Sequence, residues 1–430
     1  MYLDEIVTAQ KRGEARGIVS ICSAHPYVLK QTLKVFAHRP RSEEQGAETF
    51  RVSPLIEATC NQVNQFGGYT GMTPAGFVRY VHGMAKENHF PFERIILGGD
   101  HLGPSVWQDE PAGSAMQKAE LLVQDYVQAG FIKIHLDCSM RLADDPEGAL
   151  DVEVSAGRSA RLARVAERVG NENLRYVIGT EVPIPGGAKE HEEGVNVTKV
   201  EDARQTIEVT REAFYRAGLG SAWERVIAVV LQPGVEFGDD FVLPYLSESA
   251  RELSKFIESQ PMVYEAHSTD YQTCQALKDL VRDHFAILKV GPALTFAFRE
   301  AVFALALMEN ELFASDERSN IISVLDDVMV EYPEHWVKYY HGSEEGQAFK
   351  RRYSLSDRIR YYWTYPMVQQ AFEKLMMKLN QNLLPVTLVK QYAPDVFTVT
   401  GKAGGFTPEE ILLAKIQTVL DDYAQACNLH

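Results

Sequence analysis

Asp100 and His101 stand side by side in the segment RIILGGDHLGP, which spans Arg94–Pro104. An apolar run and two glycines precede the pair, as at the exit of a strand buried on both faces. Parallel α/β folds carry their chemistry at the carboxyl ends of such strands. A carboxylate can transfer a proton there and an imidazole can bind a metal ion. The alternative is an Asp that caps a helix beside a His that only packs.

Other polar residues also follow short apolar runs, and several of them could hold a metal ion. His101, His267 and Glu181 together supply two imidazoles and a carboxylate. This set is sufficient for a catalytic Zn²⁺ or a similar divalent ion with an open position for substrate. Gln232 is a further predicted ligand. The alternative is that the histidines are structural groups held by hydrogen bonds.

The predicted catalytic residues are three carboxylates, Asp100, Asp137 and Glu265. Adjacent residues of a strand point to opposite sides, so we expect His101 to hold the ion while Asp100 faces the substrate. A carboxylate near a dication stays ionised and can transfer a hydroxyl proton. Lys289 offers a rival mechanism through a Schiff base with a ketone. An ion pair with a neighbouring carboxylate is the simpler interpretation of this lysine.

Two segments favour substrate binding. The Gly-rich stretch Asn61–Thr73 lets backbone N–H groups approach a phosphate or a polyhydroxyl chain, with a tight turn as the alternative. Arg351–Trp363, RRYSLSDRIRYYW, is predicted to be a lid or phosphate clamp, with the solvated face of an amphipathic helix as the alternative. The predicted substrate-binding residues are Asn61, Gln65, Gly68, His135, Lys289, Ser354 and Arg358.

Eight short apolar runs alternate with helical patterns up to about residue 300, and this alternation is typical of βαβ units. Eight such units predict a closed (β/α)8 TIM barrel, whose strand ends would bring the residues above to one mouth. An open doubly wound sheet is the alternative, and it would more often carry a glycine-rich nucleotide motif. The runs are Gly17–Ser23, Pro54–Thr59, Ile95–Gly99, Ile132–Asp137, Arg175–Gly179, Val226–Leu231, Met262–Glu265 and Ala286–Val290.

The last part of the chain has a different character. Long helical patterns cover Ile321–Glu331, Pro366–Gln381 and Pro408–Cys427, whereas Leu383–Val389 is ambiguous between strand and helix. We therefore expect a barrel over residues 1–310 and a helical C-terminal extension over 311–430.

Composition excludes several classes of partner. The net charge of −16 is unfavourable for nucleic acid, and no apolar run approaches the roughly 20 residues of a membrane span. The five cysteines are scattered without C-x-x-C pairs, as in a cytoplasmic protein with reduced thiols.

Long motifs give the chain a close resemblance to a known family. IEATCNQVNQFGGYTGMTP, IILGGDHLGP, YVIGTEVP, VVLQPGVEF, VYEAHSTDYQT and RYSLSDRIRYYW resemble the Z subunits of class II D-tagatose-1,6-bisphosphate aldolases of galactitol catabolism. The resemblance spans nearly the whole chain. It implies a TIM barrel, a divalent metal (zinc first, with manganese, nickel or cobalt as alternatives) and a ketohexose or ketohexose phosphate as substrate. A homo-oligomer is also expected.

The same resemblance implies roles for single residues. Asp100 falls where class II aldolases keep their proton-transfer aspartate, and His101 and His267 fall where they keep metal ligands. Glu181 resembles an acid near the ion. Gln232 departs from the pattern, because such aldolases carry another metal-binding histidine there.

Two functions remain open at this stage. The first is metal-dependent aldol chemistry at C3–C4, as an aldolase or as a ketohexose 4-epimerase working alone. The second is the accessory role described for the family, in which the Z subunit supports a separate catalytic subunit. Sequences of this family have also been labelled tagatose-6-phosphate kinase, but the chain contains no P-loop motif.

Overall fold

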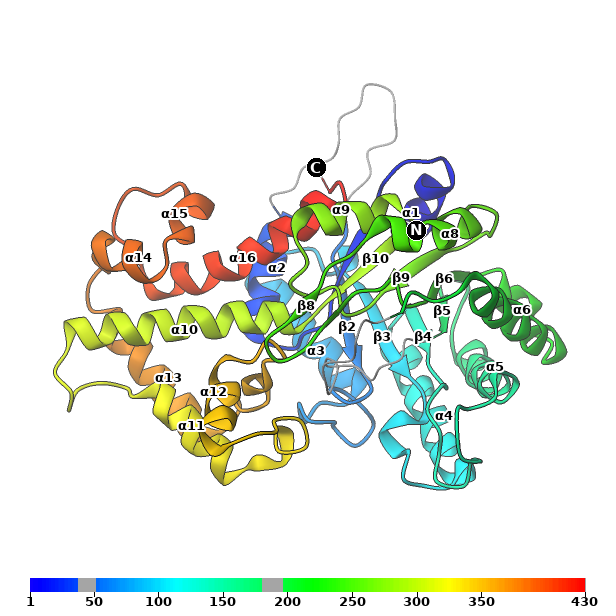
Figure 1. Ribbon diagram of the computed structural model, residues 1–430, viewed down its shortest axis with the longest axis horizontal. Coiled ribbons are helices and arrows are strands. Elements are labelled where there is room, and N and C mark those ends of the chain that lie inside the picture. Colours follow the sequence, from blue (N-terminus) through cyan, green and yellow to red (C-terminus); the bar gives the residue numbers. More distant parts are fainter. Residues whose placement is uncertain (38–51, 180–195, 430) are drawn as a thin grey trace.

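Eight parallel strands close into a barrel in this computed structural model, which describes residues 1–37, 52–179 and 196–429 (Figure 1). The order around the barrel is β1-β10-β9-β6-β5-β4-β3-β2. Each strand overlaps one of the eight predicted runs, so the TIM-barrel prediction is confirmed. The barrel strands are β1 (Ile18–Ile21), β2 (Leu55–Thr59), β3 (Ile96–Leu102), β4 (Lys133–Leu136), β5 (Arg175–Gly179), β6 (Val226–Val230), β9 (Val263–Ala266) and β10 (Phe285–Val290).

Helices surround the barrel and pack their apolar sides against the outward-facing strand residues. The helix α3 begins where Thr73 caps the N–H of Gly76 and Pro74 takes the first helical position. A short hairpin, β7 (Glu236–Phe237) with β8 (Val242–Leu243), lies after β6. The helices of this part are α1 (Tyr2–Lys11), α2 (Pro26–Ala37), α3 (Pro74–Glu87), η1 (Phe92–Arg94), η2 (Pro104–Trp107), α4 (Ala112–Ala129), α5 (Val152–Val169), α6 (Val200–Arg216), α7 (Gly220–Trp223), α8 (Ser247–Glu258), α9 (Cys274–Arg282) and α10 (Pro292–Leu312).

The C-terminal helices are arranged around α10, which extends beyond the barrel (Figure 1). The last helix, α16, returns along α10 and also packs on α2 and α9, which ties the end of the chain to the barrel. Its first turn is closed by a capping box between Thr407 and Glu410. These helices are α11 (Ile321–Glu331), η3 (Pro333–His335), α12 (Glu344–Tyr353), η4 (Arg358–Tyr361), α13 (Pro366–Leu379), α14 (Val386–Tyr392), α15 (Asp395–Thr400) and α16 (Pro408–Ala426).

Two ambiguous segments are resolved by the structure. The stretch Leu383–Val389 is mainly the start of α14, with a single strand-like bridge between Leu384 and Phe406. The segment Arg351–Trp363 is not one amphipathic helix, because α12 ends at Tyr353 and a turn leads into η4.

Glycines around Asp100 and His101 make room for neighbouring groups inside the barrel. A Cβ atom on Gly98 would lie 2.7 Å from Oε1 of Glu57, whose side chain crosses the barrel at this level. A Cβ on Gly103 would lie 1.7 Å from the backbone oxygen of Asp137. Glycine at these two positions therefore has a steric cause: neighbouring atoms of the barrel lie too close for a side chain.

We expect Gly103→Ala to lower the free energy of unfolding by about 3 kcal/mol, because its new methyl group meets a backbone atom that cannot rotate away. Gly157→Ala is the control, since Gly157 is an exposed residue inside α5 with open space around it. The control should gain about 0.5–1 kcal/mol through helix propensity. Urea denaturation of both variants measures the difference; equal stabilities would contradict the steric argument.

Candidate active site

A cavity of about 970 Å³ opens at the carboxyl ends of the barrel strands. Its walls come from the strand exits and from the C-terminal part of the chain, which contributes Lys338, Arg360 and Trp363. A TIM barrel uses this face for catalysis. Six residues that the sequence predicted for the site line the cavity: Asn61, Asp100, His101, Asp137, His267 and Lys289.

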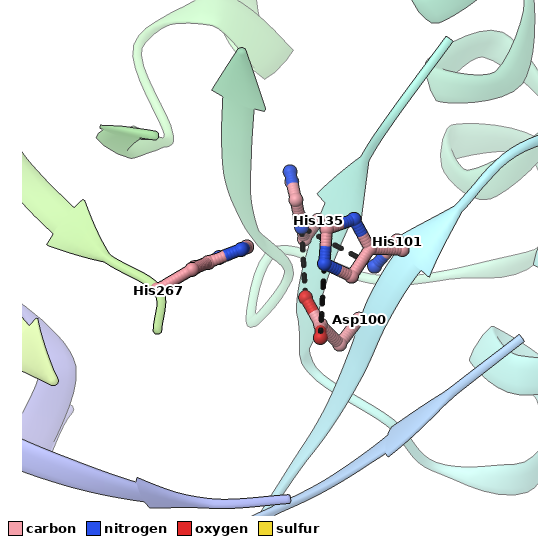
Figure 2. A group of neighbouring side chains, drawn as sticks. All are labelled: Asp100, His101, His135 and His267. Carbon is pink, nitrogen blue, oxygen red and sulfur yellow. Dashed lines mark hydrogen bonds and ion pairs between the residues drawn. The ribbon is translucent and has the colours of Figure 1, made fainter. Parts of the chain in front are cut away.

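Four buried side chains form a potential metal site beside this cavity. Asp100, His101, His135 and His267 each offer one ligand atom, and these atoms lie within 4.8 Å of one another. Figure 2 shows His267 approaching from β9 toward the three residues of β3 and β4. Imidazole and carboxylate donors of this kind suit zinc and similar divalent ions. The donor set therefore fits the metal that the resemblance implies.

Asp100 is held in place by hydrogen bonds and ion pairs. Its Oδ1 lies 2.8 Å from Nδ1 of His135, and its Oδ2 pairs with Nζ of Lys289. Burial by itself raises the pKa of Asp100, but the charges of His101 and Lys289 outweigh burial and hold this pKa well below its usual range. The side chain is therefore a carboxylate that faces the cavity and can accept a proton.

Both ring nitrogens of His135 face oxygen acceptors. Nε2 lies 2.9 Å from the backbone oxygen of Gly179, and Nδ1 faces the Asp100 carboxylate. The backbone N–H of His101 also donates to this Nδ1 at 3.2 Å, so Nδ1 has both a donor and an acceptor within reach. Burial by itself lowers the pKa of His135, but its contacts with Asp100 more than compensate and raise this pKa above its usual value. Sequence reasoning placed His135 with the substrate, whereas the structure places it in the group around Asp100.

The other two histidines are oriented by carboxylates. Nδ1 of His101 lies 2.7 Å from Oδ2 of Asp137, and Nε2 of His267 lies 2.9 Å from Oε1 of Glu265. Metal-binding histidines commonly hydrogen-bond a carboxylate through one nitrogen, which fixes the ring and its tautomer. Asp137 and Glu265 were predicted as catalytic. Their contacts suit positioning of His101 and His267 instead.

The backbone at His101 departs from a regular strand. His101 has a φ of 49°, in the left-handed region that residues with a side chain rarely adopt, and the pairing of β3 with β4 shifts its register between Gly99 and Leu102. Asp100 and His101 consequently both face the cavity. The expectation that they point to opposite sides is therefore wrong, because it assumed a regular strand. Such strain is typical of functional sites.

A buried charge network lies directly below the cavity. Lys133, on β4, is inaccessible to solvent, and its Nζ lies 2.6 Å from Oε1 of Glu57 and 2.7 Å from Oε2 of Glu265. Lys289 adds a second ammonium, 3.1 Å from Oε2 of Glu57. The network connects Asp100 to the carboxylate that orients His267. Sequence reasoning missed Glu57 and Lys133; a charged residue inside an otherwise apolar strand was the available signal.

The comparisons with known proteins agree with one another. The family model "D-tagatose-1,6-bisphosphate aldolase subunit GatZ/KbaZ-like" matches residues 3–428. The chain belongs to the GatZ/KbaZ-like family.

Relatives of this GatZ/KbaZ-like chain cover its whole length. The "D-tagatose-1,6-bisphosphate aldolase subunit GatZ" of Klebsiella pneumoniae is 51% identical over 99% of both chains, and that of Salmonella heidelberg is 50% identical over 99% of both. A solved structure from Sinorhizobium meliloti, described as a probable tagatose 6 phosphate kinase, is 45% identical. It covers 96% of this chain and 100% of its own, with a TM-score of 0.87.

One predicted metal ligand of the GatZ/KbaZ-like chain, Gln232, has its side-chain oxygen occupied by the backbone. Oε1 of Gln232 accepts the backbone N–H groups of Gly234 and Val235 at 2.8 and 3.0 Å, so this amide closes its own turn. Its placement corrects the prediction that Gln232 completes the metal site. Glu181 lies outside the described residues.

Several predicted substrate-binding residues also have structural partners. Gln65 donates to the backbone oxygen of Lys118, and Ser354 donates to Asp239. Arg358 donates to the backbone oxygen of His335 and stacks on a tyrosine ring. Gly68 has a φ of 55° with no room for a Cβ, which indicates a tight turn. None of these four residues lines the described cavity, since each is used to hold a loop or helix end.

The clamp segment nevertheless reaches the site through other residues. Arg360, Tyr361 and Trp363 line the cavity, although Ser354 and Arg358 do not. Tyr361 packs edge-on against Tyr69 of the Gly-rich loop, with ring centroids 4.7 Å apart. The helical extension therefore closes the cavity against the loop after β2. Residue type alone could not distinguish Arg360 from Arg358.

We expect no Schiff base at Lys289. Burial by itself lowers the pKa of this lysine, but the surrounding charges, Asp100 first, hold it well above its usual range, so the amine stays protonated and cannot attack a ketone. Borohydride reduction in the presence of D-tagatose should leave the mass of the protein unchanged, while a lysine-dependent aldolase treated in parallel gains the sugar fragment. A reduced adduct on the Lys289 peptide would contradict this assignment.

Proposed function

We propose that this GatZ/KbaZ-like chain catalyses metal-dependent aldol chemistry at C3–C4 of a ketohexose or its phosphate, in tagatose metabolism. The observation that carries the proposal is the convergence of Asp100, His101, His135 and His267, from three separate strands, beside one cavity. A purely structural barrel mouth has no need for four buried titratable donors around one point, or for a strained backbone at His101.

The four donors are the residues that would hold the divalent ion, with Asp100 also placed to act as the base. When bound, the ion supplies a Lewis acid that polarises the ketose carbonyl. Asp100 removes the proton of the C4 hydroxyl, the C3–C4 bond breaks, and its electron pair passes into the C2–C3 fragment as an enediolate. Asp137 and Glu265 keep His101 and His267 oriented, and the Lys289 ammonium adds positive charge beside the developing anion.

The same first step leads to two outcomes. Return of the proton from Asp100 to C3, followed by release of both three-carbon products, is aldolase action. Rotation of the bound aldehyde and addition to its other face restores the C3–C4 bond with inverted configuration at C4, which is 4-epimerisation. Zinc is the proposed ion, with manganese, nickel or cobalt as alternatives, and the proposed setting is the cytoplasm, as a homo-oligomer. None of the described helices is long and apolar enough to cross a membrane.

A second candidate function is supported by the relatives. The similar proteins from Klebsiella and Salmonella are named as aldolase subunits, which favours a role beside another chain. In this alternative the barrel supports a separate class II tagatose-bisphosphate aldolase subunit and performs no reaction of its own.

Metal removal tests the first candidate. Chelation with EDTA should abolish the turnover of D-tagatose, D-fructose and their phosphates, and addition of the metal should restore it.

Asp100→Asn should retain the fold but lose about 10³-fold in turnover, because the base can no longer accept a proton. Sugar products are measured by chromatography and metal content by mass spectrometry. Ser323→Ala is the control, since Ser323 is exposed on α11 and does not line the cavity. Turnover that is unchanged after chelation would contradict the metal-dependent mechanism.

Purification without a partner separates the two candidates. Under the first, the isolated chain cleaves or epimerises a ketohexose substrate, and Asp100→Asn abolishes that activity. Under the second, the isolated chain is inert, yet it raises the activity or the melting temperature of a class II tagatose-bisphosphate aldolase subunit, and Asp100→Asn does so equally well.

A further inference from the structure

Asp270 occupies a position in the cavity wall where a TIM barrel often binds phosphate. It lies in the loop after β9, the seventh barrel strand, and faces the start of α10, directly after the eighth. TIM barrels frequently bind phosphate with the loops after strands seven and eight. In this chain, Oδ1 of Asp270 accepts the backbone N–H groups of Gly291 at 3.0 Å and Ala293 at 2.8 Å. An internal carboxylate thus uses the donors that an anionic ligand would need.

The loop that carries Asp270 is held rigidly in this position. Oγ1 of Thr269 donates to the backbone oxygen of Lys289, and the hydroxyl of Tyr423 on α16 donates to the backbone oxygen of Thr269 at 2.8 Å. Ser268 and Tyr271, on either side, both have positive φ values, and the hydroxyl of Tyr271 donates to Leu355. Contacts from the C-terminal extension therefore keep the Asp270 side chain, which is only 3% exposed, against Gly291 and Ala293.

The cations around the cavity have other partners, and they compensate for this carboxylate only in part, through the charge of Arg360. Among the described lining residues, Lys289 is paired with Asp100 and Glu57, while Arg360 donates to the backbone oxygens of Ser356 and Asp357 and to the hydroxyl of Tyr361. Lys338 is the remaining lining cation, and it is exposed. Burial raises the pKa of Asp270 to about 6, against the effect of the two N–H groups and Arg360, so the carboxylate is largely ionised at neutral pH.

We propose that Asp270 is a specificity-determining residue: it fills the anion site formed by the loops after β9 and β10, so the cavity accepts a ketohexose whose end at this wall is uncharged and rejects a ketohexose bisphosphate. The reacting C3–C4 bond lies in the middle of a six-carbon chain. A ketohexose 1,6-bisphosphate carries a phosphate dianion at each end, so in either orientation one dianion lies toward Asp270. One dianion would meet the Asp270 carboxylate. This inference rests on the proposed function for the identity of the sugar.

Inorganic phosphate is the direct probe, titrated calorimetrically into the full-length protein. Asp270→Ala frees two backbone donors and removes a charge, so we expect it to bind phosphate at least about tenfold more tightly than the wild type. Asp270→Asn is the matched control, because its amide oxygen can still accept both N–H groups, and its gain should be smaller. Equal phosphate affinity of the wild type and Asp270→Ala would overturn the proposal.

Binding measurements on the wild type test the proposal if Asp270→Ala does not fold. D-tagatose should bind the wild type at least as tightly as D-tagatose 1,6-bisphosphate does. In crystals soaked with phosphate, the N–H groups of Gly291 and Ala293 should still donate to Asp270. Tighter binding of the bisphosphate, or an anion on those two groups, would overturn the proposal. These readouts are binding measurements, so loss of turnover on its own would refute the proposed catalysis and leave the role of Asp270 intact.

Discussion

The structure depends on mutual compensation of charges inside a barrel that excludes water. Glu57, Asp100 and Glu265 are three carboxylates on different strands, and each needs a cation because an isolated buried charge is strongly unfavourable. Lys133 and Lys289 lie between them. Nδ1 of His135 adds a contact with Asp100 at 2.8 Å. Removal of any one member weakens the compensation of its buried partners, so the network constrains all five strands that carry it, β2, β3, β4, β9 and β10.

This network also explains how the reactive groups are held. The ammonium group of Lys289 contacts both Asp100 and Glu265, and that of Lys133 contacts Glu265. Glu265 in turn contacts His267. Glu57 contacts both ammonium groups. The positions of these groups are therefore determined by the barrel interior rather than by the loops. The strained φ of His101 is tolerated because Asp137 holds its ring from the neighbouring strand. Rigid positioning of this kind suits chemistry that depends on distances of a few tenths of an ångström.

The C-terminal extension has a second role beyond covering the barrel. It brings Arg360 and Trp363 to the cavity, and through Tyr423 it holds the loop that carries Asp270. The features that distinguish this cavity from a simple barrel mouth thus come largely from helices that are distant in sequence. Its relatives carry a name that refers to a bisphosphate, whereas the role proposed for Asp270 favours an uncharged sugar end. An accessory role toward the bisphosphate reaction and a separate activity on another ketohexose are compatible in one chain.

Much of the fold and part of the site could be predicted from the sequence, because the signals were local. The alternation of apolar runs and helical patterns determined the eight-stranded barrel, and Gly98 and Gly99 marked the part of β3 that carries Asp100 and His101. What the sequence could not determine depended on long-range geometry. The backbone irregularity at His101, the pairing of Lys133 with Glu57 and the capture of the N–H groups of Gly291 and Ala293 by Asp270 involve segments that are distant in the sequence. Gln232 and Arg358 have suitable chemistry but are occupied by nearby backbone groups, since only the tertiary structure decides which donors and acceptors remain for a ligand.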